Sequence, residues 1–169
     1  MITVRRELPA DITAIRQINR ATFGQFAEAE IVGALRSVSA LTLSLIAQLD
    51  DRIVGHIAFS PVKIKSAGRI TNAIGLAPMP VLPEYQKRGI GARLATEALG
   101  ILQRLGHKVV IVVGHPSYYA RFGFVSAHNH EIRCEYECPP EAFMLKELQD
   151  NALKGISGIV RFRPEFASV

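Results

Sequence analysis

Aromatic residues are scarce in this sequence. Tryptophan is absent, and 4 tyrosines and 8 phenylalanines make up the aromatic content of 169 residues. Proteins that bind single-stranded nucleic acid usually stack the bases on several aromatic side chains. A chain with so few aromatic residues has little material for such a surface, and we expect no nucleic-acid partner.

Cysteine is also scarce, because Cys134 and Cys138 are the two that the sequence contains. Two cysteines are too few for a disulfide framework or for a four-thiolate zinc site. Their C-x3-C spacing would place both side chains on the same face of a strand. The sequence therefore predicts two reduced, half-buried thiols and no metal site.

Long apolar runs are missing as well. The longest strongly apolar stretch, Leu41 to Leu49, is interrupted by Thr42, Ser44 and Gln48. It is far shorter than the roughly 20 residues of a membrane span. No basic segment followed by an apolar one opens the chain, so we expect no signal peptide. These absences predict a cytoplasmic protein without a membrane partner.

The sequence does contain enough apolar material for one domain. Hydrophobic residues make up 49% and charged residues 21% of the chain, as in ordinary globular proteins. A chain of this length buries roughly 70% of the surface that it exposes when unfolded. We therefore expect a single domain spanning residues 1–169. The net charge of +5 favours an anionic partner without identifying it.

Hydrophobic periodicity predicts a mixed α/β chain with a mostly antiparallel sheet. Gly75, Pro78 and Pro80 interrupt one predicted strand, so we expect a bulge or a splayed end there. That strand, the longest helix and the next strand form a crossover unit, which makes the two strands parallel. The predicted strands are 2–6, 43–49, 52–60, 62–65, 70–81, 108–113 and 158–162. One predicted helix begins after Asp11, and four others cover about 26–36, 89–105, 118–122 and 141–148.

The most informative segment runs from Val81 to Leu94, between a predicted strand and the longest helix. The start of a helix presents unpaired N–H groups and the positive end of the helix dipole, which together attract anions. Residues 84–108 hold five basic and two acidic residues, so part of the positive charge lies next to this helix start. The segment lacks the P-loop string, and Leu94 replaces the third glycine of a dinucleotide fingerprint. A third pattern, Q-x-x-G-x-G, fits a pyrophosphate site.

This segment resembles motif A of the GNAT superfamily of acetyl-CoA-dependent N-acyltransferases. The resemblance is detailed over residues 70–124 and extends to the order of elements in the first 60 residues. It implies the GNAT fold, an α/β fold whose mixed, mostly antiparallel central sheet is splayed at the cofactor site and flanked by helices. It also implies acetyl-CoA as cofactor and CoA as product. Backbone groups of Met79 and Val81 would contact pantetheine and the acetyl carbonyl, and the diphosphate would be held by Gln86, Lys87, Arg88, Gly89, Ile90 and Gly91.

A second string, Tyr119 to Phe124, resembles the Y-x-x-x-G-F motif of the same family. Tyr119 then falls on the tyrosine that commonly protonates the departing CoA thiolate. A phenol, with an ordinary pKa of about 10, keeps its proton at neutral pH. Where the family often has asparagine, this chain reads Gly114-His115-Pro116-Ser117. Further strings are similar to a bacterial branch of predicted N-acetyltransferases, a label that names no substrate.

Amine acetylation needs a group that takes a proton from the attacking amine. The candidate bases are Glu30 and His56, with Glu28 and Glu84 as weaker candidates. No histidine is spaced to activate either cysteine for an acyl-enzyme route, so direct transfer in a ternary complex is favoured.

The predicted function is therefore acetyl transfer to a primary amine of a small-molecule or peptide acceptor. The alternative is a non-catalytic acyl-CoA sensor or assembly module on the same fold. The sequence leaves the acceptor open, and it leaves open whether the protein is a monomer or a homodimer.

Overall fold

The structure is a computed structural model that describes residues 1–23 and 27–168. The strands are β1 (Ile2–Arg6), β2 (Leu43–Leu49), β3 (Arg52–Ser66), β4 (Arg69–Leu76), β5 (Val109–Val113), β6 (Val125–Ser126), β7 (Ile132–Cys134), β8 (Phe143–Glu147) and β9 (Gly158–Arg161). The helices are α1 (Ile12–Phe23), α2 (Ala27–Ser37), α3 (Ile90–Arg104) and α4 (Pro116–Ala120). The short 3-10 helices are η1 (Pro9–Asp11), η2 (Pro83–Tyr85), η3 (Ala127–His130), η4 (Pro140–Ala142) and η5 (Pro164–Ser168).

The chain forms two compact units, and β3 and α3 contribute residues to both. Unit 1 comprises Met1–Ser60, Ala77–Gly100 and Pro164–Val169, and unit 2 comprises Pro61–Leu76 and Ile101–Arg163. The expectation of one domain over residues 1–169 stays a prediction.

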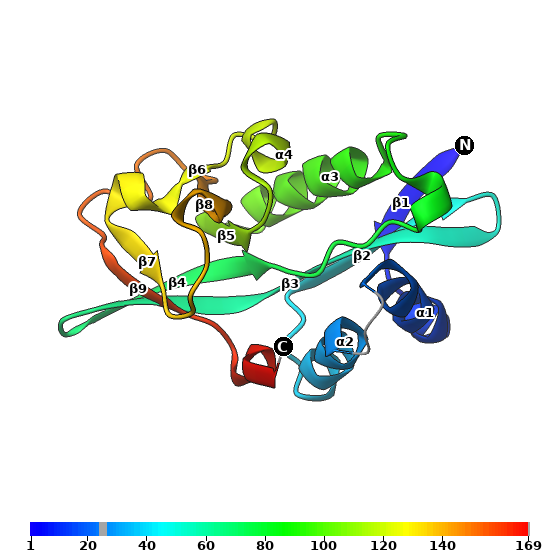
Figure 1. The fold of residues 1–169 in the computed structure, drawn as a ribbon, viewed down its shortest axis with the longest axis horizontal. Helices are drawn as coiled ribbons and strands as arrows, with labels where there is room; N and C mark the ends of the chain where they lie inside the picture. The colour runs from blue at the N-terminus through cyan, green and yellow to red at the C-terminus, as the bar shows by residue number, and fades with distance from the viewer. Residues whose placement is uncertain (24–26, 169) are drawn as a thin grey trace. The chain divides into compact units, whose positions relative to one another are not determined.

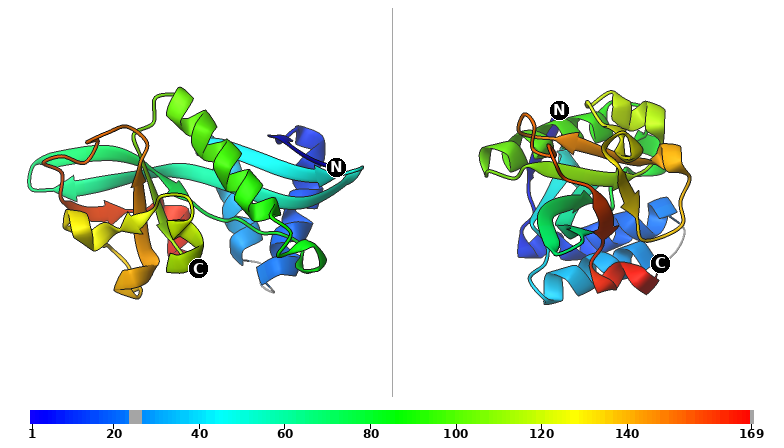
Figure 2. Two further views of the ribbon diagram at one scale, coloured as in Figure 1. Left: turned by 90° about the horizontal axis from the view of Figure 1, so that it is seen from above. Right: turned by 90° about the vertical axis from the view of Figure 1, so that its left-hand side faces the viewer.

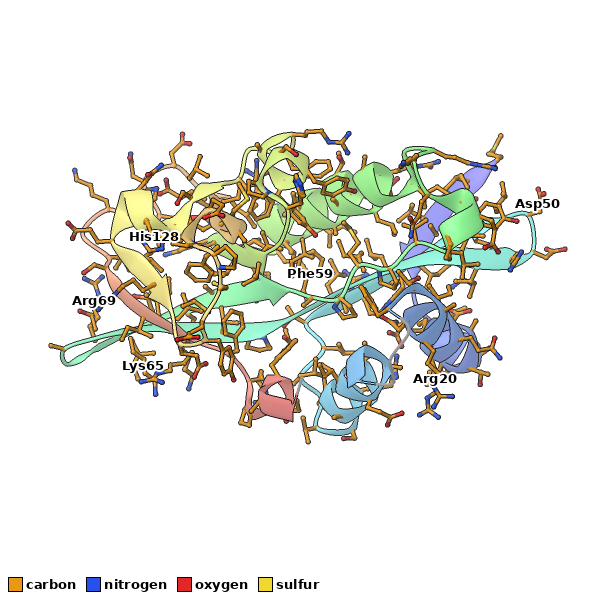
Figure 3. All side chains as sticks on the ribbon, viewed as in Figure 1. Arg20, Asp50, Phe59, Lys65, Arg69 and His128 are labelled. Atoms are coloured by element: carbon orange, nitrogen blue, oxygen red, sulfur yellow. The ribbon has the colours of Figure 1, made fainter. Side chains whose placement is uncertain are left out.

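The sheet of unit 1 is an antiparallel meander in the order β1-β2-β3. In this sheet, Ile2 of β1 pairs with Leu49 of β2, and Leu43 of β2 pairs with Phe59 of β3. Asp50 has a φ of 52° in the turn between β2 and β3. Phe59 is fully buried in this unit (Figure 3). The predicted strands 2–6 and 43–49 and the predicted hairpin are confirmed.

Helices cover both faces of this meander (Figure 1). On one face, α1 and α2 pack on β2 through a buried cluster of Ile15, Val32 and Ile46. The first part of α3 lies on the other face and crosses the strands obliquely (Figure 2). A Cβ on Gly55 of β3 would lie 3.1 Å from Leu94 of this helix, so glycine permits the close approach.

Unit 2 holds the mixed part of the sheet. β4 and β5 are parallel, at Ile74↔Val110 and Gly75↔Ile111, as the crossover predicts. β8 pairs antiparallel with both β5 and β6, β9 is antiparallel to β3, and β7 is parallel to β9. The β3–β4 hairpin turns near Gly68, with exposed Lys65 and Arg69 on either side of the turn (Figure 3).

Three sequence predictions need correction. First, β3 continues through Pro61 to Ser66 instead of stopping at residue 60. The strand tolerates proline at position 61 because this position is exposed. Second, residues 143–147 form strand β8 rather than part of a helix, because five residues of β5 pair with it. Third, β7 ends at Cys134, so Cys138 does not share a strand with it.

The remaining helix predictions differ from the structure by one or two residues. The long helix predicted over 89–105 is α3, followed by Gly106 with a φ of 90°. The helix predicted near 118–122 is α4, which begins at Pro116. The predicted break at Gly24 and the start of the second helix at Phe26 lie outside the described residues.

Candidate active site

The segment after β4 continues along β3 with irregular pairing. Backbone N–H groups of His56 and Ala58 donate to the carbonyls of Pro80 and Pro78, both at 3.0 Å. The N–H of Ala77 donates to the Ala58 carbonyl at 3.0 Å, so two successive residues face Ala58. This two-to-one arrangement is that of a β-bulge. Each proline lacks an N–H and uses its carbonyl here, which explains why prolines are tolerated in this extended segment.

This pairing turns the backbone of Met79 away from β3, because successive residues of an extended chain point to opposite edges. Within the described residues, neither the N–H nor the C=O of Met79 has a hydrogen-bond partner. The Val81 carbonyl accepts hydrogen bonds from Thr22 Oγ1 at 3.3 Å and from Gln86 Nε2 at 2.9 Å. The segment therefore has a fixed conformation and still offers free backbone groups at residue 79.

The glycine-containing loop leads directly into α3. Lys87 and Gly89 have φ angles of 63° and 83°, in the left-handed region that glycine adopts without strain. The Arg93 N–H donates to the Gly89 carbonyl at 3.0 Å, so Gly89 caps the helix. No backbone N–H from Lys87 to Ala92 donates a hydrogen bond within the described part of the chain. The loop therefore presents a run of unpaired donors at the positive end of a helix dipole.

Side chains around the loop add positive charge. Lys87 and Arg88 are exposed. The guanidinium groups of Arg88 and Arg52 each lie 5.4 Å from the centre of the Tyr85 ring, and Arg52 also pairs with Glu84 at 3.1 Å. Glu84 is thus a loop residue that holds Arg52. Arg52 is not predicted from the sequence, because it precedes the loop by more than thirty residues and belongs to no motif.

In unit 2, Tyr119 of α4 lies within an aromatic cluster that also includes Tyr118 and Phe124. Its ring centre is 5.1 Å from that of Tyr118 and 5.6 Å from that of Phe124, both in edge-to-face geometry. Burial, with a smaller contribution from neighbouring Tyr118, raises the pKa of Tyr119 to about 12. The Tyr119 hydroxyl has no hydrogen-bond partner in the described part of the chain. At neutral pH this phenol is therefore protonated and free to donate.

Two glycines shape the surroundings of Tyr119. A Cβ on Gly114 would lie 2.4 Å from Cε2 of the Tyr119 ring, so only glycine leaves room for the ring. The Gly114 N–H donates to the Ala142 carbonyl at 2.9 Å, which fixes the loop that carries it. Gly123 follows α4 with a φ of 89°. Gly114, in the string where the family often has asparagine, thus has a packing role that the sequence does not predict.

The two main candidate bases have different surroundings. His56 is fully buried; its Nε2 lies 2.8 Å from Ser44 Oγ and its Nδ1 lies 3.4 Å from Asn19 Nδ2. Burial lowers the pKa of His56 to about 3, and the positive charge of Arg36 acts in the same direction. Glu30, by contrast, is 60% exposed on α2 and forms an ion pair with Arg20 at 3.5 Å. The Glu28 side chain lies outside the described residues.

Two further structural findings concern metal sites and membrane-spanning helices. In the described ranges 1–23 and 27–168, no three side chains of His, Cys, Asp or Glu are grouped to hold a metal ion. Over the same ranges, no helix has the length and apolar character needed to cross a membrane.

Comparison with known proteins identifies the family. The model of the acetyltransferase (GNAT) domain matches residues 3–127. The chain belongs to the GNAT acetyltransferase family. The match agrees with the resemblance of motif A, and it includes the bulged segment after β4, the glycine loop and Tyr119.

Relatives similar over nearly the whole chain support this membership. The uncharacterized N-acetyltransferase YhbS of Escherichia coli K12 is 36% identical and covers 96% of this chain and 97% of its own. The crystal structure of E. coli YhbS in complex with CoA has a TM-score of 0.93, at 35% identity over 98% of this chain and 92% of that one. A GNAT family acetyltransferase from Brucella melitensis in complex with acetyl-CoA has a TM-score of 0.82, at 35% identity over 98% of both chains.

The GNAT fold predicted from sequence is therefore confirmed, including its mixed, mostly antiparallel sheet with flanking helices. The roles assigned by family position to Met79, Val81, the loop 86–91 and Tyr119 stay predictions. The structure adds residues that support these positions and that carry no motif of their own, namely Thr22, Arg52, Gly55 and Gly114.

Proposed function

We propose that this GNAT protein transfers the acetyl group of acetyl-CoA to a primary amine of a small-molecule or peptide acceptor, directly within a ternary complex. Family membership supports acyl transfer, and the E. coli and Brucella relatives were crystallised with CoA and acetyl-CoA. The observation that carries the proposal is the run of unpaired backbone N–H groups from Lys87 to Ala92. Such a run at a helix start suits an anionic diphosphate.

The loop residues fit the proposed cofactor. A Cβ on Gly89 would meet no atom within 4 Å, so the backbone there is open to a ligand. The exposed side chains of Lys87 and Arg88 place two positive charges beside the unpaired donors. Gln86, by contrast, donates its side-chain amide to the Val81 carbonyl and acts by holding the loop closed. We propose that the loop amides and the two cations hold the diphosphate.

The extended segment 77–82 supplies the next part of the proposed site. Met79 has an unpaired N–H and C=O, the groups that pair with the amides of a pantetheine arm in the way that strands pair. Thr22 and Gln86 already occupy the Val81 carbonyl, which leaves the Val81 N–H as its free backbone group. We propose that this N–H serves as a backbone donor to the thioester oxygen, where negative charge builds during transfer.

Tyr119 is the proposed general acid. Bound acetyl-CoA would supply an activated thioester, whose departing thiolate needs a proton. Because burial raises the pKa of Tyr119 to about 12, the phenol carries that proton throughout the neutral range. Its hydroxyl is not engaged by any described residue, so no hydrogen bond has to break before it donates.

Glu30 is the proposed base. It is exposed and carries a carboxylate, whereas His56 has no exposed surface and a pKa of about 3. A histidine with so low a pKa is a weak base at neutral pH. We propose that His56 acts by supporting the interior of unit 1 through Ser44 and Asn19.

Cofactor binding tests the loop. Gly91→Glu places a carboxylate among the proposed phosphate donors, and like charges about 4 Å apart near a protein surface repel by roughly 4 kcal/mol. We expect the affinity for CoA, measured by calorimetry, to fall about 100-fold or more. Thr96→Glu adds the same charge at an exposed position one turn further along α3 and should bind CoA nearly as tightly as the wild type. Equal affinity of all three proteins would refute the loop as the diphosphate site.

Turnover tests Tyr119. Tyr119→Phe keeps the ring and removes the proton donor, so release of the CoA thiol should slow about 100-fold while CoA affinity stays unchanged. Tyr118→Phe is the matched control, because it removes a neighbouring phenol on the same helix. If both variants lose the same amount of activity, Tyr119 has no special role.

The alternative function is a non-catalytic acyl-CoA sensor or assembly module. The observation that favours it is that one candidate base is buried and the other is ion-paired. A broad panel of amines, from small metabolites to peptides, separates the two functions. Release of the CoA thiol with any amine supports transfer, and binding of acetyl-CoA without release across the panel supports the sensor.

A further inference from the structure

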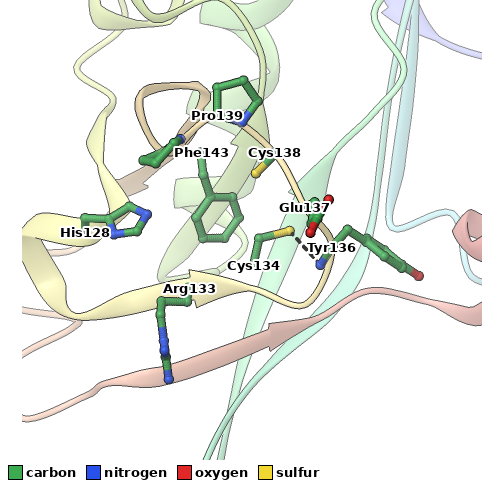
Figure 4. A pocket seen from close by; sticks show the side chains of 9 residues that line it. His128, Arg133, Cys134, Tyr136, Glu137, Cys138, Pro139 and Phe143 are labelled. Carbon is green, nitrogen blue, oxygen red and sulfur yellow. Dashed lines mark hydrogen bonds between the residues drawn. The ribbon is translucent and has the colours of Figure 1, made fainter.

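Unit 2 contains a cavity of about 610 Å³, and none of the residues that line it takes part in the proposed reaction. It is bounded by β7, by the chain segment that leads from β7 to η4, and by Phe143 at the start of β8 (Figure 4). Cys134 and Cys138 both line it, and both are free and half-buried. The two cysteines of the whole sequence therefore face the same space.

The chain turns between these two cysteines and brings their sulfurs together. Four residues of a continuous strand would separate them by roughly 13 Å. Here β7 ends at Cys134, and the N–H of Tyr136 donates to Cys134 Sγ at 3.4 Å, which closes a turn. Cys138 then lies close enough to Cys134 for their thiols to interact. Figure 4 shows both side chains directed into the same part of the cavity.

Neighbouring structure holds this turn in place. The β7 strand pairs with β9, with Cys134 opposite Val160. Beyond β7, the Tyr136 ring stacks on that of Phe162 with the ring centres 5.8 Å apart. The Glu135 carboxylate accepts a hydrogen bond from the Phe162 N–H. Pairing with β9 and packing on Phe162 thus hold in place the turn that carries the two thiols.

We propose that Cys134 and Cys138 form a modification site, in which a hydroperoxide oxidises the two thiols to an intramolecular disulfide. One thiolate attacks the outer oxygen of the hydroperoxide, so an S–O bond forms, the O–O bond breaks and an alcohol leaves. The second thiol attacks the resulting sulfenic sulfur, so the S–S bond forms, the S–O bond breaks and water leaves. Two thiols and one hydroperoxide thus give one disulfide, one alcohol and one water.

Either thiol can make the first attack, and the other then resolves it. Burial is the main reason that the pKa of the Cys134 thiol is raised to about 11; the interaction with Cys138 contributes, and the hydrogen bond from Tyr136 acts in the opposite direction. Because the thiolate is the nucleophile, this raised pKa slows the attack of Cys134 on the hydroperoxide.

Mass spectrometry of the full chain tests the site directly. The reduced protein is treated with tert-butyl hydroperoxide, and the intact mass and the number of titratable thiols are measured. We expect the mass to fall by two hydrogen atoms and both thiols to disappear, with dithiothreitol restoring them. Peptide mapping should link Cys134 to Cys138 within one chain. Retention of both thiols, addition of oxygen without a link, or a link only between two chains would each overturn the proposal.

Single variants test whether each thiol resolves the other. With Cys134→Ser or Cys138→Ser, the remaining thiol should gain one oxygen and be trapped by dimedone, because no second thiol resolves it. Circular dichroism and thermal unfolding check that both variants are folded. If neither folded variant is trapped by dimedone, the proposal is overturned. The readouts involve no acetyl transfer, so their outcome is independent of the proposed function.

Discussion

Two regions of this protein contribute to the proposed reaction in different ways. In the segment from Ala77 to Gly91, the groups offered to a ligand are mainly backbone N–H and C=O groups, to which Lys87 and Arg88 add positive charge. In the region from Gly114 to Phe124, the group offered is one side chain, the Tyr119 phenol, and the backbone makes room for it. The first region depends on local conformation, and the second depends on packing between distant residues.

The difference decides which substitutions each region tolerates. A loop that acts through its backbone is sensitive to the residues that set φ angles, such as Gly89 with its φ of 83°. A buried side chain is sensitive to anything that changes the space around it, because protein interiors are close-packed. A glycine with a steric role supports each region. Gly55 of β3 lies against the start of α3, which follows the first region, and Gly114 lies against Tyr119 in the second, so the two can be compared directly.

The largest effect is expected at Gly114. In Gly114→Ala the new Cβ would lie 2.4 Å from Tyr119 Cε2, so the ring must leave its position among Tyr118 and Phe124. We expect the free energy of unfolding in urea to fall by about 3 kcal/mol, the upper end of the usual cost of overpacking. Thiol release from acetyl-CoA should fall with it, because the phenol moves.

A double-mutant cycle shows whether the clash is the cause. In a Tyr119→Leu background the ring is gone, so Gly114→Ala should cost less than 1 kcal/mol there. An equal cost in both backgrounds would mean that Gly114 is needed for its own backbone and not for the space it leaves.

A smaller effect is expected at Gly55. The added Cβ of Gly55→Ala would lie 3.1 Å from Leu94 Cδ1 and 3.2 Å from Ile90 Cγ2, and these side-chain ends can move by a few tenths of an ångström. We expect a loss of about 2 kcal/mol in the free energy of unfolding. Because Ile90 begins α3 and Val81 bridges to Gly55, CoA affinity should also weaken by about 10-fold.

Gly33→Ala is the matched control for Gly55→Ala. Its Cβ would have Arg16 Nη2 as nearest neighbour at 3.9 Å, an ordinary contact, and the position lies within α2. Replacing a helical glycine by alanine there should stabilise the protein by up to about 1 kcal/mol. If both substitutions change the free energy of unfolding alike, close packing of α3 on β3 does not explain why residue 55 is glycine.

The two regions also differ in how far they could be predicted from sequence. Gly89 and Gly91 before an apolar helical stripe predict the loop and the start of α3, because these features are set by residues next to each other. The prolines at 78 and 80 predict an irregular strand end for the same reason. The neighbours of Tyr119 could not be predicted, since Gly114 acts on it through space and the carbonyl that fixes Gly114 belongs to Ala142.

Long-range pairing explains the main errors in the fold as well. Residues 141–148 contain good helix formers, but pairing of Phe143–Glu147 with β5 overrides that local preference. His56 reads as a candidate base from its residue type alone, and only the structure shows that it is enclosed between Asn19 and Ser44. Local sequence pattern therefore predicts the segment that acts through its backbone, and tertiary structure is needed to describe the surroundings of side chains such as His56 and Tyr119.

The smallest effect concerns the pH dependence of stability and tests how deeply Tyr119 is buried. Its pKa is about 12 in the folded protein and about 10 in an unfolded chain. The folded state thus holds this proton more tightly, and the resulting stability is fully present below pH 10 and lost as the pH rises from 10 to 12. Relative to Tyr119→Phe, the wild type should lose about 1 kcal/mol of unfolding free energy between pH 9 and pH 11. Using the difference between the two proteins removes the contribution of the lysines, which titrate in the same range. Parallel curves for wild type and Tyr119→Phe in urea unfolding across this interval would show that the phenol is solvated, and the packing contrast between the two regions would then be lost.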